Sequence, residues 1–218
     1  FAEEAKTGSA ALDIQALDGV TIAVKMAAEV VAVFACCADG CPRSVFQIDV
    51  GSQYGIDTDG VIVSETLPTS CTNVMSELKT GERTFFYTKG ANSDLDIDDI
   101  PVDSLECDIF HIGYLCLLDA LDAPDEQYGT RMGRLLHAVN KRGIKTSIDV
   151  VSEASDRFRR LVSPALRYTD YCVINEVEAS ATTGIELRDA DGKLVMENFP
   201  KALKAMKDMG VSTWAVIH

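Results

Sequence analysis

The stretch YCVINEVE, residues 171–178, contains an apolar run followed at once by Asn175 and, three positions later, by Glu178. The run is typical of a buried strand, and the residues after it are typical of a helix start. In open parallel sheets, ligands bind where strands end and helices begin. Two interpretations stay open: Asn175 and Glu178 form a capping box, or the Glu holds a metal or its water shell while the Asn orients a phosphate oxygen.

The composition is that of a globular protein with an excess of acidic residues. The chain has 218 residues, 47% of them hydrophobic, which suffices for one substantial core and a small appendage. Its formal charge of -14 disfavours nucleic acid and acidic membrane surfaces as partners. Its seven cysteines lack paired C-x-x-C spacing, which is typical of reduced thiols in the cytoplasm. We therefore expect a cytoplasmic protein.

From about residue 29 onward, strand-like and helix-like segments alternate. The expected strands cover residues 29–37, 108–114, 145–150, 171–174 and 211–217. The expected helices cover residues 43–54, 124–142, 155–162, 176–183 and 198–209, the third of them stopped by Pro164. This alternation predicts a parallel sheet with right-handed crossovers, whose ligand groups lie at the carboxyl ends of the strands.

Three shorter β-type segments, at residues 61–63, 72–78 and 84–89, predict a small β-sheet inserted in this unit. The last two are joined by a loop that contains Gly81, which is typical of a hairpin.

Other polar residues fit structural roles better than chemical ones. The acidic residues of segment 94–99 predict a solvated connector, because the glycine that a calcium loop requires is missing. Arg157, Arg159 and Arg160 predict an exposed helix face, and His111 predicts a histidine buried in a strand.

Three sequence features occur in the order seen in one family. An opening with Gly8, Ser9 and Asp13 is followed by the hairpin segment 81–92, which ends in Gly-Ala-Asn, and then by the Asn-x-x-Glu of residues 175–178. In this order, and with this βα alternation, nearly the whole chain resembles the ribokinase-like sugar kinases, also called the PfkB carbohydrate kinase family. The resemblance implies a three-layer αβα sandwich with a mostly parallel central sheet. It also implies a small β-sheet lid with strands from about residues 56–92, within one partial domain, 1–218.

The activity that the resemblance implies is transfer of the ATP γ-phosphoryl group to a hydroxyl of a sugar or nucleoside, with Mg²⁺. Such transfer needs alignment, a base and charge neutralisation. By resemblance, Asn175 and Glu178 lie on the phosphate side, and Glu178 holds the metal through water. Asp149 ends a strand where related kinases carry a phosphate-facing Asp, although an Asp that caps the next turn is an equal alternative.

The substrate side matches the family less closely. Related kinases carry Gly-Gly followed by Asn, where this chain has Gly8, Ser9 and Asp13. Gly8 allows close backbone approach, and Asp13 can accept hydroxyl protons. Asn92 is either a polar contact of the pocket or a turn residue. Arg83 is either a solvated loop residue or a lid residue that reaches an anionic substrate.

No catalytic residue can be assigned within residues 1–218, because the family's Gly-Ala-Gly-Asp segment is expected after His218. We therefore expect the chain to be a partial kinase. Two alternatives stay open: a non-catalytic sugar- or nucleotide-binding sensor, and a module that dimerises through its lid. Phe85 and Tyr87 alternate on one strand face, so they can pack against a second lid in a homodimer.

Overall fold

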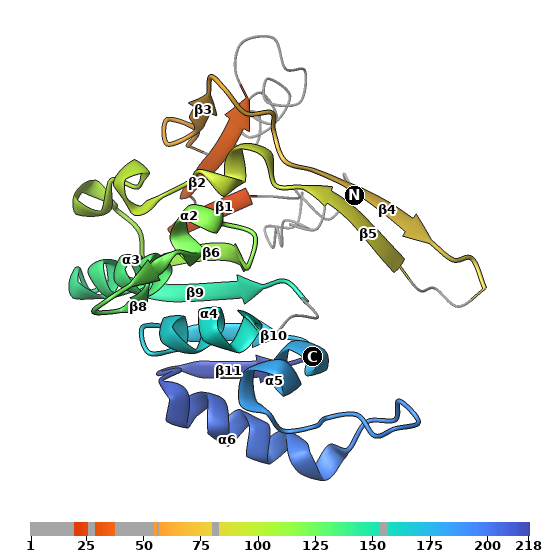
Figure 1. The fold of residues 1–218 in the computed structure, drawn as a ribbon. Helices are drawn as coiled ribbons and strands as arrows, with labels where there is room; N and C mark the ends of the chain where they lie inside the picture. The colour runs from red at the N-terminus through yellow and green to blue at the C-terminus, as the bar shows by residue number, and fades with distance from the viewer. Residues whose placement is uncertain (1–19, 26–28, 38–54, 56, 80–82, 153–156) are drawn as a thin grey trace.

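The computed structural model describes residues 20–25, 29–37, 55, 57–79, 83–152 and 157–218, with the backbone alone described at 20–25, 29–37 and 83. Its centre is a seven-stranded sheet with the order β11-β10-β9-β6-β1-β2-β3 (Figure 1). The strands are β1 (Val20–Lys25), β2 (Glu29–Cys37), β3 (Ile62–Ser64), β6 (Ile109–Leu115), β9 (Lys145–Val150), β10 (Tyr171–Ile174) and β11 (Trp214–Ile217). Strands β6, β9, β10 and β11 are parallel, and β1 runs antiparallel to both β6 and β2. The predicted α/β architecture is thereby confirmed.

The main helices of the described residues cover one face of this sheet (Figure 1). They are α3 (Arg131–Lys141), α4 (Arg157–Leu166), α5 (Glu176–Thr183) and α6 (Phe199–Met209). Successive parallel strands are neighbours, so right-handed crossovers place all four helices on the same side. Strand β10 reflects this arrangement, since Cys172 and Ile174 are buried in the core while Val173 is exposed. No helix in the described part of the chain is long and apolar enough to cross a membrane.

The predicted hairpin is confirmed as an antiparallel ribbon of β4 (Cys71–Ser76) and β5 (Arg83–Thr88), which projects from the body of the protein (Figure 1). Two strands differ from expectation. Strand β3 does not join this ribbon but pairs with β2 in the main sheet, where Ile62 packs against the core. Strand β1 has no counterpart among the expected strands. Only three residues separate it from β2, so the two form a hairpin that the sequence pattern did not reveal.

The helix expected over residues 124–142 begins later, at Arg131. Pro124–Asp125 instead forms the short strand β7, paired with β8 (Gly129–Thr130). The Asp125 carboxylate accepts hydrogen bonds from the N–H groups of Gln127 and Tyr128, which stabilises a turn in place of a helical start. Thr130 is the N-cap, and its hydroxyl accepts from Gly133 N at 3.0 Å. A side-chain cap therefore decides where this helix begins.

Helix α4 continues through Pro164 to Leu166, although a stop near the proline was expected. Proline removes a backbone donor and disfavours a helix interior. Here, however, Ala165 and Leu166 are fully buried after the proline and extend the apolar stripe of Phe158 and Val162. Burial of this stripe outweighs the missing hydrogen bond. The helix expected over residues 43–54 lies outside the described residues.

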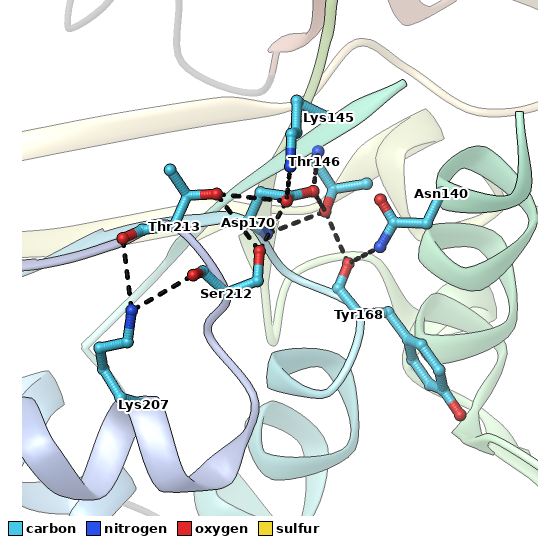
Figure 2. A network of polar contacts seen from close by, with 8 residues as sticks. All are labelled: Asn140, Lys145, Thr146, Tyr168, Asp170, Lys207, Ser212 and Thr213. Carbon is cyan, nitrogen blue, oxygen red and sulfur yellow. Dashed lines mark hydrogen bonds and ion pairs between the residues drawn. The ribbon is translucent and has the colours of Figure 1, made fainter. Parts of the chain in front are cut away.

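A buried carboxylate ties together the amino ends of three neighbouring strands (Figure 2). Asp170, at 5% exposure, accepts a 2.6 Å hydrogen bond from Lys145 Nζ and one of 3.0 Å from Thr146 N. The Ser212 hydroxyl donates to it at 2.6 Å. Burial by itself raises the pKa of this carboxyl, but the donors from Lys145, Ser212 and Thr146 hold it below its ordinary value. The network fixes the register of the strand ends opposite the candidate site.

Candidate functional site

Asn175 and Glu178 form a reciprocal capping box at the start of α5, directly after β10. The Asn175 side-chain oxygen accepts from Glu178 N at 2.9 Å, and Glu178 Oε2 accepts from Asn175 N at 2.9 Å. The capping interpretation of this pair is therefore confirmed. It does not exclude a ligand, because the box holds the carboxylate at the carboxyl edge of the parallel strands, where such sheets bind ligands.

Ser152 joins this box from the segment that follows β9. Its hydroxyl donates to Glu178 Oε1 at 2.8 Å, and Asn175 Nδ2 donates to the same hydroxyl at 3.2 Å. The three side chains thus close a ring of hydrogen bonds in which both oxygens of Glu178 are fixed. Sequence analysis did not single out Ser152. In the sequence, the feature that could have identified Ser152 as a site residue is its position three residues after Asp149, at the end of the neighbouring strand.

The electrostatic environment of this site favours a cation. Burial raises the pKa of the Asp149 carboxyl to about 6, and the negative charge of Glu178 adds to this effect. Burial also raises the pKa of the Cys172 thiol to about 12, with Asp149 and Glu178 contributing in the same direction. Two carboxylates therefore lie close together at the carboxyl ends of β9 and β10, and the negative charge of both raises the pKa of the Cys172 thiol.

The carboxylates of this site suit a hydrated magnesium ion better than a directly ligated one. Glu178 is 6% exposed and both its oxygens accept protein hydrogen bonds, so it suits a water-mediated contact better than direct ligation. The described residues contain no group of three or more acidic, His or Cys side chains arranged to hold a metal. Magnesium commonly keeps several waters and binds through one or two carboxylates and substrate phosphates. Asp149 and Glu178 fit this pattern.

The residues expected on the substrate side lie elsewhere or cannot be placed. Asn92 belongs to a 3-10 helix, Gly90–Ser93, at the foot of the ribbon; it is buried, and its Nδ2 donates to Ser70 Oγ at 3.3 Å. Its helical turn packs against β2 and α2 (Asp119–Asp122), away from Asn175 and Glu178. Arg83 pairs with Ser76 at the first position of β5, but only its backbone is described. The expected residues Gly8, Ser9 and Asp13 lie outside the described residues.

The foot of the ribbon requires a glycine at position 90. Gly90 has φ +52, and a Cβ there would lie 2.2 Å from the Pro68 carbonyl oxygen. Only glycine tolerates both the conformation and the close approach. This tight contact fixes the direction in which the chain enters the turn that contains Asn92.

Comparison with protein-family models matches residues 21–218 to the pfkB family carbohydrate kinases. The chain belongs to this family. The match extends from β1 to the end of β11, so it includes the main sheet, the ribbon and the Asn175–Glu178 box of this PfkB protein. A search of curated proteins finds no significant match.

Solved structures share the fold of the PfkB protein at low sequence identity. Ribokinase from Giardia lamblia matches with a TM-score of 0.60 and 16% identity, covering 84% of this chain and 51% of that chain. A 2-dehydro-3-deoxygluconokinase from Thermotoga maritima matches with 0.58 and 16%, covering 78% and 55%. A fructokinase from Xylella fastidiosa, solved with bound ATP, matches with 0.55 and 16%, covering 80% and 52%. The predicted ribokinase-like fold is confirmed, and the chain spans about half the length of these structures.

Proposed function

We propose that this protein takes part in ATP-dependent phosphorylation of a sugar or nucleoside hydroxyl, with Mg²⁺ as the metal. One observation carries the proposal: the ring of Ser152, Asn175 and Glu178 lies beside Asp149 at the carboxyl ends of β9 and β10. This edge of a parallel sheet is where such folds bind nucleotides and similar ligands. Membership of the pfkB carbohydrate kinases supports the same class of reaction.

On the phosphate side, each residue of the ring has a distinct task. Glu178 holds waters of the magnesium shell, because its oxygens retain acceptor capacity beyond the hydrogen bonds from Ser152 and Asn175. The Asn175 amide donates one proton to Ser152 and keeps a second for a phosphate oxygen. Asp149 adds negative charge beside Glu178, so a bound divalent cation would lower the repulsion between these carboxylates and the phosphates.

On the substrate side, the proposal places the sugar or nucleoside between the main sheet and the ribbon of β4 and β5, which serves as a lid. Asn92 lies at the foot of the ribbon and supplies a polar contact, and we assign Arg83, the first residue of β5, to an anionic group of the substrate. Gly8, Ser9 and Asp13 complete this side by resemblance to the family. We expect the protein to act in the cytoplasm, where ATP is available and thiols stay reduced.

The proposal is tested by nucleotide binding rather than by turnover alone. A ligand that binds only the folded state raises its apparent stability. We expect a non-hydrolysable ATP analogue to raise the melting temperature, and Mg²⁺ to enlarge that increase in the natural protein. Glu178→Gln keeps the shape of the side chain but should abolish the magnesium-dependent part. Glu176→Gln on the same helix, whose carboxylate pairs with Arg188, is the matched control.

The outcomes separate the possible functions. Binding of nucleotide and a sugar, followed by transfer of phosphate to a member of a sugar and nucleoside panel, supports the kinase. Selective binding of a sugar or nucleotide without transfer by the full-length protein supports the sensor alternative. A magnesium effect that is equal in Glu178→Gln and Glu176→Gln would reject the role given to Glu178.

Dimerisation through the ribbon is a second candidate function, and the exposed apolar side chains of β4 and β5 favour it. Phe85, Phe86 and Tyr87 are each about half exposed, and Met75 on the paired strand is 64% exposed. Apolar side chains gathered on a two-stranded ribbon commonly mark an interaction surface. We propose that a second copy of the chain covers them, which would also hold two lids at a fixed distance from their pockets.

A further inference from the structure

A cavity of about 260 Å³ lies between α2, the β7–β8 turn and the first turns of α4. Its polar lining comes from Asp119, Asp122, Thr130, Arg157 and Arg160, and Leu161 contributes an apolar wall. Drug-sized ligands occupy pockets of about 300–1,000 Å³, so this cavity suits a smaller molecule. None of these residues belongs to the ring of Ser152, Asn175 and Glu178.

Asp122 lines this cavity, and its carboxyl group carries an acceptor that no described donor satisfies. Its side chain is 7% exposed, and Oδ1 accepts from Cys116 N at 3.3 Å. Oδ2 is buried and has no hydrogen-bond partner in the part of the chain that the structure describes. Burial raises the pKa of this carboxyl to about 6, so most of it is ionised at neutral pH. A buried ionised oxygen without a donor is costly, and a ligand that supplies a donor removes that cost.

The charged residues around Asp122 differ in whether they already form an ion pair or a hydrogen bond. Asp119 forms an ion pair with Lys89, and Arg157 donates to the Cys116 carbonyl at 3.1 Å. This contact corrects the expectation that Arg157 belongs to an exposed helix face. Arg160 is exposed, lines the cavity, and forms no ion pair among the described residues. Among the described residues, the cavity lining therefore includes an acceptor without a donor in Asp122 and, on the α4 side, a cation without an ion pair in Arg160.

We propose that this cavity binds a small zwitterion, of about amino-acid size, with its ammonium on Asp122 Oδ2 and its acidic group on Arg160. The ammonium supplies the missing donor, and the guanidinium forms a charge-assisted pair with a carboxylate, phosphonate or phosphate. The bound molecule would contact the end of β6, because Asp122 and Arg157 hold the two backbone groups of Cys116. Cys116 has φ 79, an uncommon conformation for a residue other than glycine, so its hydrogen bonds maintain it.

The test uses a panel of glycine, β-alanine, γ-aminobutyrate and phosphoethanolamine, with methylammonium and acetate as molecules that carry only one of the two charges. Binding is followed by the rise in melting temperature and by the NMR shift of the Cys116 amide, whose N–H donates to Asp122. Asp122→Asn replaces the unsatisfied oxygen by a donor and keeps an acceptor for Cys116. Arg160→Gln removes the cation, and Arg159→Gln, at an exposed neighbour outside the cavity lining, is the matched control.

We expect at least one zwitterion to bind saturably to the natural protein and to Arg159→Gln, with tenfold or greater loss of affinity in Asp122→Asn and in Arg160→Gln. The single-charge molecules should bind more weakly than the best zwitterion. The proposal fails if no zwitterion of the panel shifts the Cys116 amide. It also fails if Asp122→Asn, shown to be folded by its melting curve, binds as tightly as the natural protein. Neither result depends on ATP, so failure here leaves the kinase proposal intact.

Discussion

The Ser152 hydroxyl donates a 2.8 Å hydrogen bond to the Glu178 carboxylate, from a residue 26 positions earlier in the chain. This contact connects the end of β9 to the first turn of α5, so the two strand ends that carry the candidate site are held as one unit. It also fixes the carboxylate in a single orientation, which a water-mediated metal contact requires.

Removal of the Ser152 hydroxyl should make the Glu178 carboxylate more mobile without unfolding the protein. Ser152→Ala loses the contacts to Glu178 and Asn175, and because Ser152 is exposed we expect the free energy of unfolding to fall by only about 1 kcal/mol. Urea titration measures the change. Ser104→Ala is the control, since its hydroxyl donates only to the nearby Pro101 carbonyl at 3.1 Å. Equal changes in the two variants would argue against a connecting role for Ser152.

The cap of α5 should depend on the side-chain oxygen of Asn175. Asn175→Ala removes the acceptor for Glu178 N, and we expect a loss of about 1–2 kcal/mol in the free energy of unfolding. Asn175→Asp keeps an oxygen at this position but adds a charge near Glu178 and Asp149. It should therefore lie between the alanine variant and the natural protein. If the alanine variant unfolds at the same urea concentration as the natural protein, the capping box contributes nothing to stability.

Asp149 should make stability depend on pH in a defined window. Its pKa rises from an ordinary value of 3.8 to about 6 in the folded chain, so between these values the folded state binds more protons than the unfolded state. Its contribution is therefore fully present below about pH 4 and is lost as the pH rises through about 6. We expect this loss to amount to about 1–2 kcal/mol, reduced by partial solvent access.

The Asp149→Asn variant should remove this part of the pH dependence. Urea titrations at pH 4, 5, 6 and 7 should give a flatter profile than the natural protein, while Asp191→Asn, at an exposed loop position, should leave the profile unchanged. Asp122 has its pKa raised to about 6 as well, so a residual slope in the same window is expected. An unaltered profile in Asp149→Asn would show that its carboxyl is not shifted.

The network around Asp170 should matter more for stability than any contact of the candidate site. Asp170→Ala leaves the buried Thr146 N–H and the Lys145 ammonium without their acceptor, and we expect a loss of about 2–4 kcal/mol. Asp208→Ala is the control, because its ion pair with Lys204 is exposed on α6 and should contribute less than about 1 kcal/mol. Thermal or urea unfolding distinguishes the two, and similar losses would contradict the structural role of Asp170.

The exposed ribbon should govern self-association. If a second copy covers β4 and β5, Phe85→Ser should shift the protein towards monomer in sedimentation velocity at a concentration where the natural protein is dimeric. Met196→Ser, at another exposed apolar residue outside the ribbon, should not. A monomer at high concentration in the natural protein would exclude the dimer.

Local sequence patterns predicted much of the core fold. Strands β9 and β10 and helix α5 have the predicted bounds. Strand β10 is a short apolar run, β9 alternates buried with less buried positions, and α5 has Asn175 at one end and Gly184 at the other. The same residues predicted both the capping box and the location of the site. The spacing of Asn175 and Glu178 is a local property of one helical turn, so it needs no knowledge of the rest of the chain.

Other features depended on partners distant in sequence. The start of α3 is decided by the Thr130 cap and the β7–β8 turn, and α4 passes Pro164 because its last turn is buried against the rest of the core. Strand β3 joins the main sheet because it pairs in parallel with β2. These are outcomes of packing and pairing, which local propensity does not determine.

The sequence by itself determined the alternation of strands and helices, the family order of motifs and the pair Asn175 and Glu178, since these follow from periodicity and short-range spacing. Only the tertiary structure decided that Ser152 completes the ring, that Asp149 lies close enough to Glu178 for the two charges to interact, and that Asp122 lines a cavity and carries a buried, unsatisfied oxygen. Such contacts join segments brought together by the crossovers of a parallel sheet, and their burial and electrostatics exist only once those segments meet.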